Sequence, residues 1–148
     1  VLEKRDIVED THKTVDYLQT RVSQQVSFSF KAPEHPIYVD INPALHSWTI
    51  ENLVKNAIDA MKGKGSLNIV ISELEDIVKI SITDTGKGIP KNQFTKVFEP
   101  GFTTKKRGWG LGLSLTKRIV QEYHKGKIKV AHSEIGKGTT MQISYKTA

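Results

Sequence analysis

Apolar residues recur at helical spacing in three stretches of the chain. The first stretch predicts a helix over residues 6–21. A second helix should begin at Asn42, a favoured capping residue that Pro43 follows, and should end near Met61. A third helix is expected over about 111–123.

Alternation of apolar and polar residues predicts strands in the remaining parts of the chain. Two of these strands are joined by a tight acidic turn and should form a hairpin. The predicted strands cover residues 26–30, 37–40, 67–74, 77–83, 127–132 and 140–145. This pattern indicates an α/β fold, a two-layer α/β sandwich in which a mixed sheet of about five strands packs on three helices.

One long segment, residues 86–112, is rich in glycine and has little regular pattern, apart from a helical turn near 92–97. Long irregular segments are uncommon inside compact domains and are usually functional loops or lids. We therefore expect a ligand-related loop here.

The composition is that of one ordinary globular domain of 148 residues, with 37% hydrophobic residues. The absence of cysteine excludes a disulfide framework, a zinc-thiolate site and cysteine catalysis, and it fits a reducing compartment. The chain begins Val1-Leu2-Glu3, without an initiator methionine, so we expect a piece of a longer protein.

The net charge of +6 is unevenly distributed along the chain. Residues 1–84 hold 9 basic and 13 acidic residues, whereas residues 85–148 hold 13 basic and 3 acidic residues. The basic half could be a nucleic-acid face, a site for a compact polyphosphate or an ordinary solvated surface. Charge alone leaves these alternatives open.

Two asparagines, Asn52 and Asn56, are four residues apart on the predicted central helix and therefore share one face. Asp59 lies one turn further along that side. Amide oxygens are hard ligands that suit Mg²⁺, which commonly bridges to substrate phosphates. Asparagine is also a mediocre helix former, so a pair within a helix favours a functional role, although a solvated polar face is the simpler alternative.

A carboxylate, Asp84, follows a predicted strand and begins the sequence Asp-Thr-Gly-Lys-Gly. The glycines would let the backbone approach a flat ligand, while the carboxylate could accept hydrogen bonds from an amine. An aspartic protease would need a second such carboxylate motif, which the chain lacks.

A second glycine-rich motif, Gly-Trp-Gly-Leu-Gly over residues 108–112, precedes the third predicted helix. Free backbone N–H groups at a helix start favour anions, and Lys105, Lys106 and Arg107 lie just before them. Neither the dinucleotide fingerprint nor a Walker lysine is present.

The order of these motifs resembles the ATP-binding domain of sensor histidine kinases, in the superfamily shared with gyrase, Hsp90 and MutL. The resemblance covers about residues 4–146 and implies a Bergerat-type fold. It rests on Asn52 and Asn56, Asp84 with Gly86 and Gly88, Phe94 and Phe98, Gly108 with Gly110 and Gly112, and Gly138 with Thr139.

The resemblance implies a role for each matching residue. Asp84 would accept the adenine amine, with Thr139 helping through a shared water. Asn56 would ligate Mg²⁺ between the phosphates of ATP, and Asn52 and Lys105 would have catalytic roles. The other implied ATP-binding positions are Gly86, Gly88 and Ile89 around the base, Thr103, Thr104 and Lys105 in a mobile lid, and Gly108, Gly110, Leu111, Gly112 and Leu113 near the phosphates.

The residue at position 52 favours a kinase over a hydrolysing member of the superfamily. Hydrolysing members place a water-activating glutamate four residues before the metal asparagine, where this chain has Asn52. Two departures are Asp59, where many members carry Lys or Arg, and Trp109, where a small residue is common. A non-catalytic nucleotide-binding scaffold and a hydrolysing ATPase remain the alternatives.

None of the five histidines has the setting of a family phosphoacceptor, a histidine on a long helix followed by an acidic residue. We therefore expect the acceptor on a separate dimerisation domain, with residues 1–5 ending a linker and 6–148 forming the catalytic domain. The resemblance also implies a homodimeric parent, membrane-bound in many relatives, a cytoplasmic location for this domain and a downstream response regulator. No nucleic-acid partner is expected.

Overall fold

The computed structural model describes residues 1–22, 24–101 and 112–148. It confirms the three predicted helices: α1 (Ile7–Gln19), α2 (Pro43–Ala60) and α3 (Gly112–Arg118), the last continuing as a π-helical turn, η3 (Ile119–Tyr123). Two short 3₁₀ turns, η1 (Lys91–Gln93) and η2 (Lys96–Phe98), occupy the segment where one helical turn was expected.

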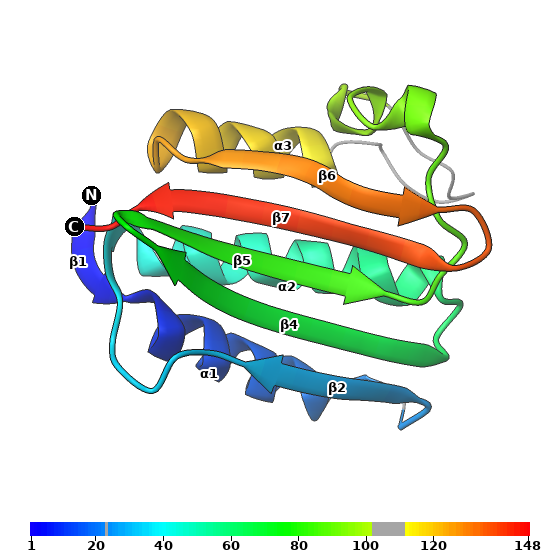
Figure 1. Ribbon diagram of the computed structural model, residues 1–148, viewed down its shortest axis with the longest axis horizontal. Helices are drawn as coiled ribbons and strands as arrows, with labels where there is room; N and C mark the ends of the chain where they lie inside the picture. Colours follow the sequence, from blue (N-terminus) through cyan, green and yellow to red (C-terminus); the bar gives the residue numbers. More distant parts are fainter. Residues whose placement is uncertain (23, 102–111) are drawn as a thin grey trace.

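Five strands form the predicted mixed sheet, in the order β2-β4-β5-β7-β6. Strand β2 is parallel to β4, and every other neighbouring pair is antiparallel. The three helices lie on one face of this sheet, which makes the two-layer α/β sandwich (Figure 1). Its strands are β2 (Val26–Lys31), β4 (Gly65–Leu74), β5 (Ile77–Asp84), β6 (Lys127–Glu134) and β7 (Gly138–Lys146).

A separate two-stranded sheet pairs β1 (Glu3–Asp6) with β3 (Tyr38–Ile41). The pattern of apolar and polar residues does not predict β1, because its four consecutive charged residues show no apolar alternation. Backbone pairing with β3 forms the strand, and Arg5 adds two hydrogen bonds of 2.9 Å to the Asp10 carboxylate. The domain boundary at residue 6 stays a prediction.

The core lies between the sheet and α2. Alternate residues of the central strands point toward the helices, including Ile69, Ile80 and Ile143, and each is fully buried. Fully burying such a side chain contributes about 1.5–3 kcal/mol. Helix α2 packs Ile50 and Leu53 against them, so its two asparagines lie beside this apolar stripe and not within it.

Within the described residues, we find no helix with the length and apolar character needed to cross a membrane.

Candidate nucleotide-binding site

Asp84 is the last residue of β5, and its side chain is 5% exposed on the helix side of the sheet. Its Oδ1 accepts hydrogen bonds from the Gly86 N–H at 2.8 Å and from the Thr139 N–H at 3.3 Å. Burial raises the pKa of the Asp84 carboxyl, and these two N–H groups offset part of that rise. Among the described residues, both bonds go to one oxygen, which leaves Oδ2 for a ligand donor.

The loop after Asp84 is held tightly between α2 and the β6–β7 hairpin. A Cβ on Gly86 would lie 2.6 Å from the backbone carbonyl of Ala60, so any side chain there would displace the end of α2. The Lys87 N–H donates to that same carbonyl at 3.1 Å. Gly88 has φ +81° and packs on the backbone of Glu134, so it also needs to be glycine. These contacts explain both glycines of the first motif.

Ser133, which belongs to none of the sequence motifs, joins this loop to Thr139. Its Oγ accepts from the Ile89 N–H at 2.7 Å and donates to the Gly138 carbonyl at 3.0 Å. The Thr139 hydroxyl lies 2.8 Å away and must donate to Ser133 Oγ, since the serine proton is already used. A register shift between Val130 and His132 precedes Ser133 on β6. The local sequence pattern does not predict this shift.

Asn52 connects the central helix to α3. Its Nδ2 donates to Thr116 Oγ1 at 2.8 Å, and that hydroxyl donates to the Gly112 carbonyl at 2.7 Å. A Cβ on Gly112 would lie 3.0 Å from Asn52 Oδ1, so the two helices meet closely here. Asn56 is half-buried one turn further along α2, on the predicted shared face.

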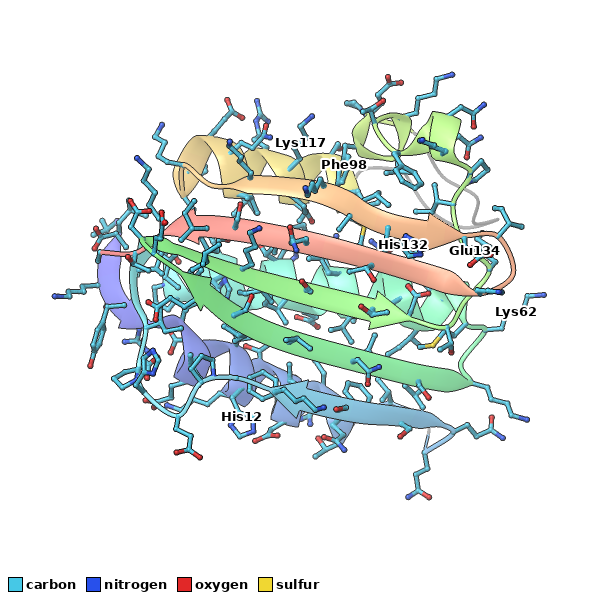
Figure 2. The ribbon with its side chains drawn as sticks, in the orientation of Figure 1. His12, Lys62, Phe98, Lys117, His132 and Glu134 are labelled. Carbon is cyan, nitrogen blue, oxygen red and sulfur yellow. The ribbon has the colours of Figure 1, made fainter. Side chains whose placement is uncertain are left out.

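The segment before the expected lid is packed into the domain. Phe98 is buried and Phe94 packs against the core. Lys117 of α3 lies over the Phe98 ring, with Nζ 5.7 Å from the ring centroid, and Figure 2 shows the two side by side. Leu113 also packs against the core, and its position beneath the phosphates stays a prediction.

Several predicted site residues lie outside the described residues: Thr103, Thr104, Lys105, Gly108, Gly110 and Leu111. Their roles stay predictions. The described residues do bring Asp84, Gly86, Gly88, Ile89 and Thr139 together at the end of β5, and Asn52, Gly112 and Leu113 where α2 meets α3.

The side chains of Asn52 and Asn56 fit a magnesium ion that takes its other ligands from a bound substrate and water. No three His, Asp or Glu residues of the described chain cluster as an all-protein metal site. The half-buried amides of Asn52 and Asn56 offer hard oxygen donors on one helix face. Such a set suits an ion that takes most of its remaining ligands from phosphates and water.

Comparison with protein families gives one match that covers most of the chain. The model for histidine kinase-, DNA gyrase B-, and HSP90-like ATPases matches residues 44–148.

Curated relatives with similar sequences are kinases. Sensor histidine kinase ZraS of Escherichia coli K12 is 39% identical over 121 residues, which are 82% of this chain and 26% of ZraS. Sporulation kinase A of Bacillus subtilis 168 is 43% identical over 95 residues, which are 64% of this chain and 15% of that kinase. The chain thus spans about a quarter or less of the length of these relatives.

Solved structures share the fold along nearly the whole chain. The catalytic domain of histidine kinase ThkA superposes with a TM-score of 0.87 at 25% identity, covering 99% of this chain and 95% of that one. Full-length ShkA in complex with AMPPNP superposes with a TM-score of 0.86 at 20% identity, and the match covers 99% of this chain and 31% of ShkA. ThkA in complex with response regulator protein TrrA superposes with a TM-score of 0.85 at 24% identity, and the match covers 99% of this chain and 42% of that chain. At 20% and 24% identity the likeness shows the fold alone.

The family match, the kinase relatives and the shared fold agree with the site geometry. The chain therefore belongs to the family of histidine kinase-, DNA gyrase B- and HSP90-like ATPases, and it is a catalytic ATPase domain of the sensor histidine kinase type.

Proposed function

We propose that this domain binds Mg²⁺-ATP and donates the γ-phosphate to a histidine on a separate dimerisation domain of the same parent protein. The observation that carries the proposal is the buried Asp84 carboxylate, held by two backbone N–H groups on Oδ1. Family membership supplies the expectation of ATP as the nucleotide.

The adenine ring would lie against the loop after β5. Asp84 Oδ2 would accept its exocyclic amine, and the backbone at Gly86 and Gly88 would allow the flat ring to approach closely. Ile89 would line the pocket. The Thr139 hydroxyl, oriented by Ser133, would accept from a water shared with the base.

The triphosphate would extend toward the junction of α2 and α3. Asn56 would hold Mg²⁺ together with the phosphates, and the bound ion would neutralise phosphate charge. Asn52 would lie beside it, its orientation set by Thr116. The remaining contacts would come from Thr103, Thr104 and Lys105 of the lid and from the backbone of Gly108, Gly110, Leu111 and Gly112, with Leu113 beneath them.

The reaction would depend on positioning and charge neutralisation. The bond from the γ-phosphorus to its bridging oxygen breaks, a bond to the acceptor imidazole nitrogen forms, ADP leaves and the imidazole releases its proton. Asn52 cannot act as a base for a water molecule, because an amide has no basic lone pair at neutral pH and its Nδ2 donates to Thr116. ATP is thereby kept for transfer.

The acceptor would lie on another part of the parent. Two of the chain's histidines, His46 and His124, are buried at 0% and 6% exposure and cannot receive a phosphoryl group without unfolding. The parent would be a homodimer, with this domain in the cytoplasm, and would pass the phosphoryl group to a response regulator. Of the two solved neighbours, ThkA is bound to response regulator protein TrrA and ShkA to AMPPNP, which are a partner and a nucleotide analogue of the kinds proposed here.

Replacing Asp84 by Asn tests the nucleotide site. The change keeps the shape but presents an amide N–H to the adenine amine, so two donors face each other. We expect Mg²⁺-ATP affinity to fall by about tenfold or more, because a hydrogen bond to a charged group is lost. Isothermal titration calorimetry measures the affinity, with Asp76→Asn at the exposed hairpin turn as the matched control. Unchanged affinity in Asp84→Asn, with folding confirmed by circular dichroism, would contradict the adenine assignment.

Adding the parent's helical domain tests transfer itself. Acid-labile phosphate on that domain is the expected product. ATP binding without transfer would favour the scaffold alternative, and ATP turnover without the partner would favour a hydrolysing ATPase.

A further inference from the structure

The open face of the sheet carries a lysine-rich groove. In Figure 1 the described helices lie behind the sheet, so no described helix covers the sheet face toward the viewer. The groove has a volume of about 360 Å³ and lies where β5 begins and β7 ends, at the opposite end of β5 from Asp84. Of its ten lining residues, none is Asp or Glu and five are lysines: Lys79, Lys125, Lys127, Lys129 and Lys146.

Strand register gives the groove lysine walls and a short polar floor. On the middle strand β7, Ser144 pairs with Lys79 of β5 on one side and with Lys127 of β6 on the other. Two residues away, Gln142 pairs with Lys129 of β6. Since neighbouring strands are about 4.8 Å apart, the two walls are about 10 Å apart. That width admits an extended chain between them.

These lysines have no acidic partner among the residues that the structure describes. Within the described part of the chain, the ion pairs between side chains involve none of these five residues. Five ammonium groups around one hollow repel one another, and a bound polyanion would relieve that repulsion. The groove is therefore a site of concentrated positive potential.

We propose that this groove binds an extended acidic segment of a partner protein, with Asp or Glu at every second position. Side chains two residues apart on one face of an extended chain are about 6.8 Å apart, and Lys127 and Lys129 have that same spacing on β6. Lys79 faces Lys127 across Ser144 and can contact the same acidic side chain. The Gln142 amide, whose Nε2 also donates to Ser81 Oγ at 3.2 Å, and the Ser144 hydroxyl add donors on the floor.

Other anions match the groove less well. Single-stranded nucleic acid needs aromatic platforms for its bases, and the one aromatic lining residue, Tyr145, is 2% exposed. A flat membrane surface would reach the lysine heads but not a recessed floor. The proposal does not depend on the ATP chemistry, because the groove and Asp84 lie at opposite ends of the sheet.

The test titrates the 148-residue chain into a fluorescent peptide of four Glu-Ser repeats and follows anisotropy at low salt. The Lys127→Gln/Lys129→Gln double variant should bind the peptide about tenfold more weakly, since two ion pairs are lost. The Lys4→Gln/Lys13→Gln variant removes the same charge from β1 and α1 and should bind like the parent. Mg²⁺-ATP affinity, measured in parallel, should be unchanged in both variants.

The proposal is overturned if the peptide does not bind, or if the two double variants lose the same amount of affinity for the peptide. It is also overturned if a single-stranded DNA or a phosphatidylserine vesicle binds more tightly than the peptide with the same dependence on Lys127 and Lys129. Thermal melting checks that both variants stay folded.

Discussion

At the scale of single residues, Asn52 has a structural role as well as its proposed catalytic one. Its amide connects α2 to α3 through Thr116, and Gly112 leaves the room that this amide occupies. The sequence predicted that Asn52 and Asn56 share a helix face, which follows from their spacing of four. The hydrogen bond to Thr116 was not predictable, because it joins residues 64 positions apart.

The close approach of Gly112 to Asn52 predicts that Gly112→Ala destabilises the domain when Asn52 is present and stabilises it when Asn52 is replaced by alanine. Gly112→Ala should lower the free energy of unfolding by about 1 kcal/mol, because the new methyl group displaces the Asn52 amide from Thr116. In an Asn52→Ala background the same change should stabilise the domain by about 0.5–1 kcal/mol, since alanine favours helix over glycine. Urea denaturation of the four proteins measures both values. Equal effects in the two backgrounds would contradict the contact.

At the scale of elements, a buried polar cluster lies where α2, the turn after η3 and β7 meet. His46 and His124 both lie edge-on to the Tyr145 ring, with centroids 6.3 Å and 5.8 Å from it. His46 Nε2 contacts Thr11 Oγ1 at 2.8 Å, and His124 Nε2 accepts from the Asn42 N–H at 3.1 Å. Burial, reinforced by nearby His124, lowers the pKa of His46 to about 4, and burial also lowers the pKa of His124.

The lowered pKa of His46 predicts acid sensitivity. Between pH 6.5 and about 4 the unfolded chain binds a proton at this histidine that the folded chain excludes. The free energy of unfolding is therefore unaffected by this histidine above pH 6.5. It should fall by up to about 3 kcal/mol as the pH drops through this window. Denaturation curves at pH 7.5 and 5.0 measure the difference. His46→Gln should reduce that difference, whereas the exposed His35→Gln should retain it. An unchanged difference in His46→Gln would refute the assignment.

At the scale of the whole molecule, the proposed nucleotide site and the small β1–β3 sheet lie at opposite ends of the main sheet. One end holds Asp84 and the Ser133–Thr139 contacts, while the small β1–β3 sheet lies at the other, near both termini (Figure 1). Asp6 connects that small sheet to α1, because its carboxylate accepts from the N–H groups of Val8 and Ile37. The N-terminal segment should therefore support stability without touching nucleotide binding.

Deleting residues 1–5 tests this separation. The truncated domain loses most of the β1–β3 pairing and the Arg5–Asp10 contact, and its free energy of unfolding should fall by about 1–3 kcal/mol. Mg²⁺-ATP affinity should stay within about twofold of the parent at a temperature where both are folded. Arg5→Gln, which retains the strand, should show a smaller loss. Weaker ATP binding in the folded truncation would contradict the separation of the two ends.

The sequence by itself determined the features that depend on local spacing. Helical periodicity located α1, α2 and α3, alternation located every strand except β1, and the order of the asparagine and glycine motifs indicated the family. Tertiary structure alone decided the pairing of β1 with β3, the contact of Ser133 with Thr139 and the alignment of Lys79 with Lys127 across Ser144. These contacts join residues distant in the chain, and strand order and register arise from packing apolar faces together, which no local periodicity encodes.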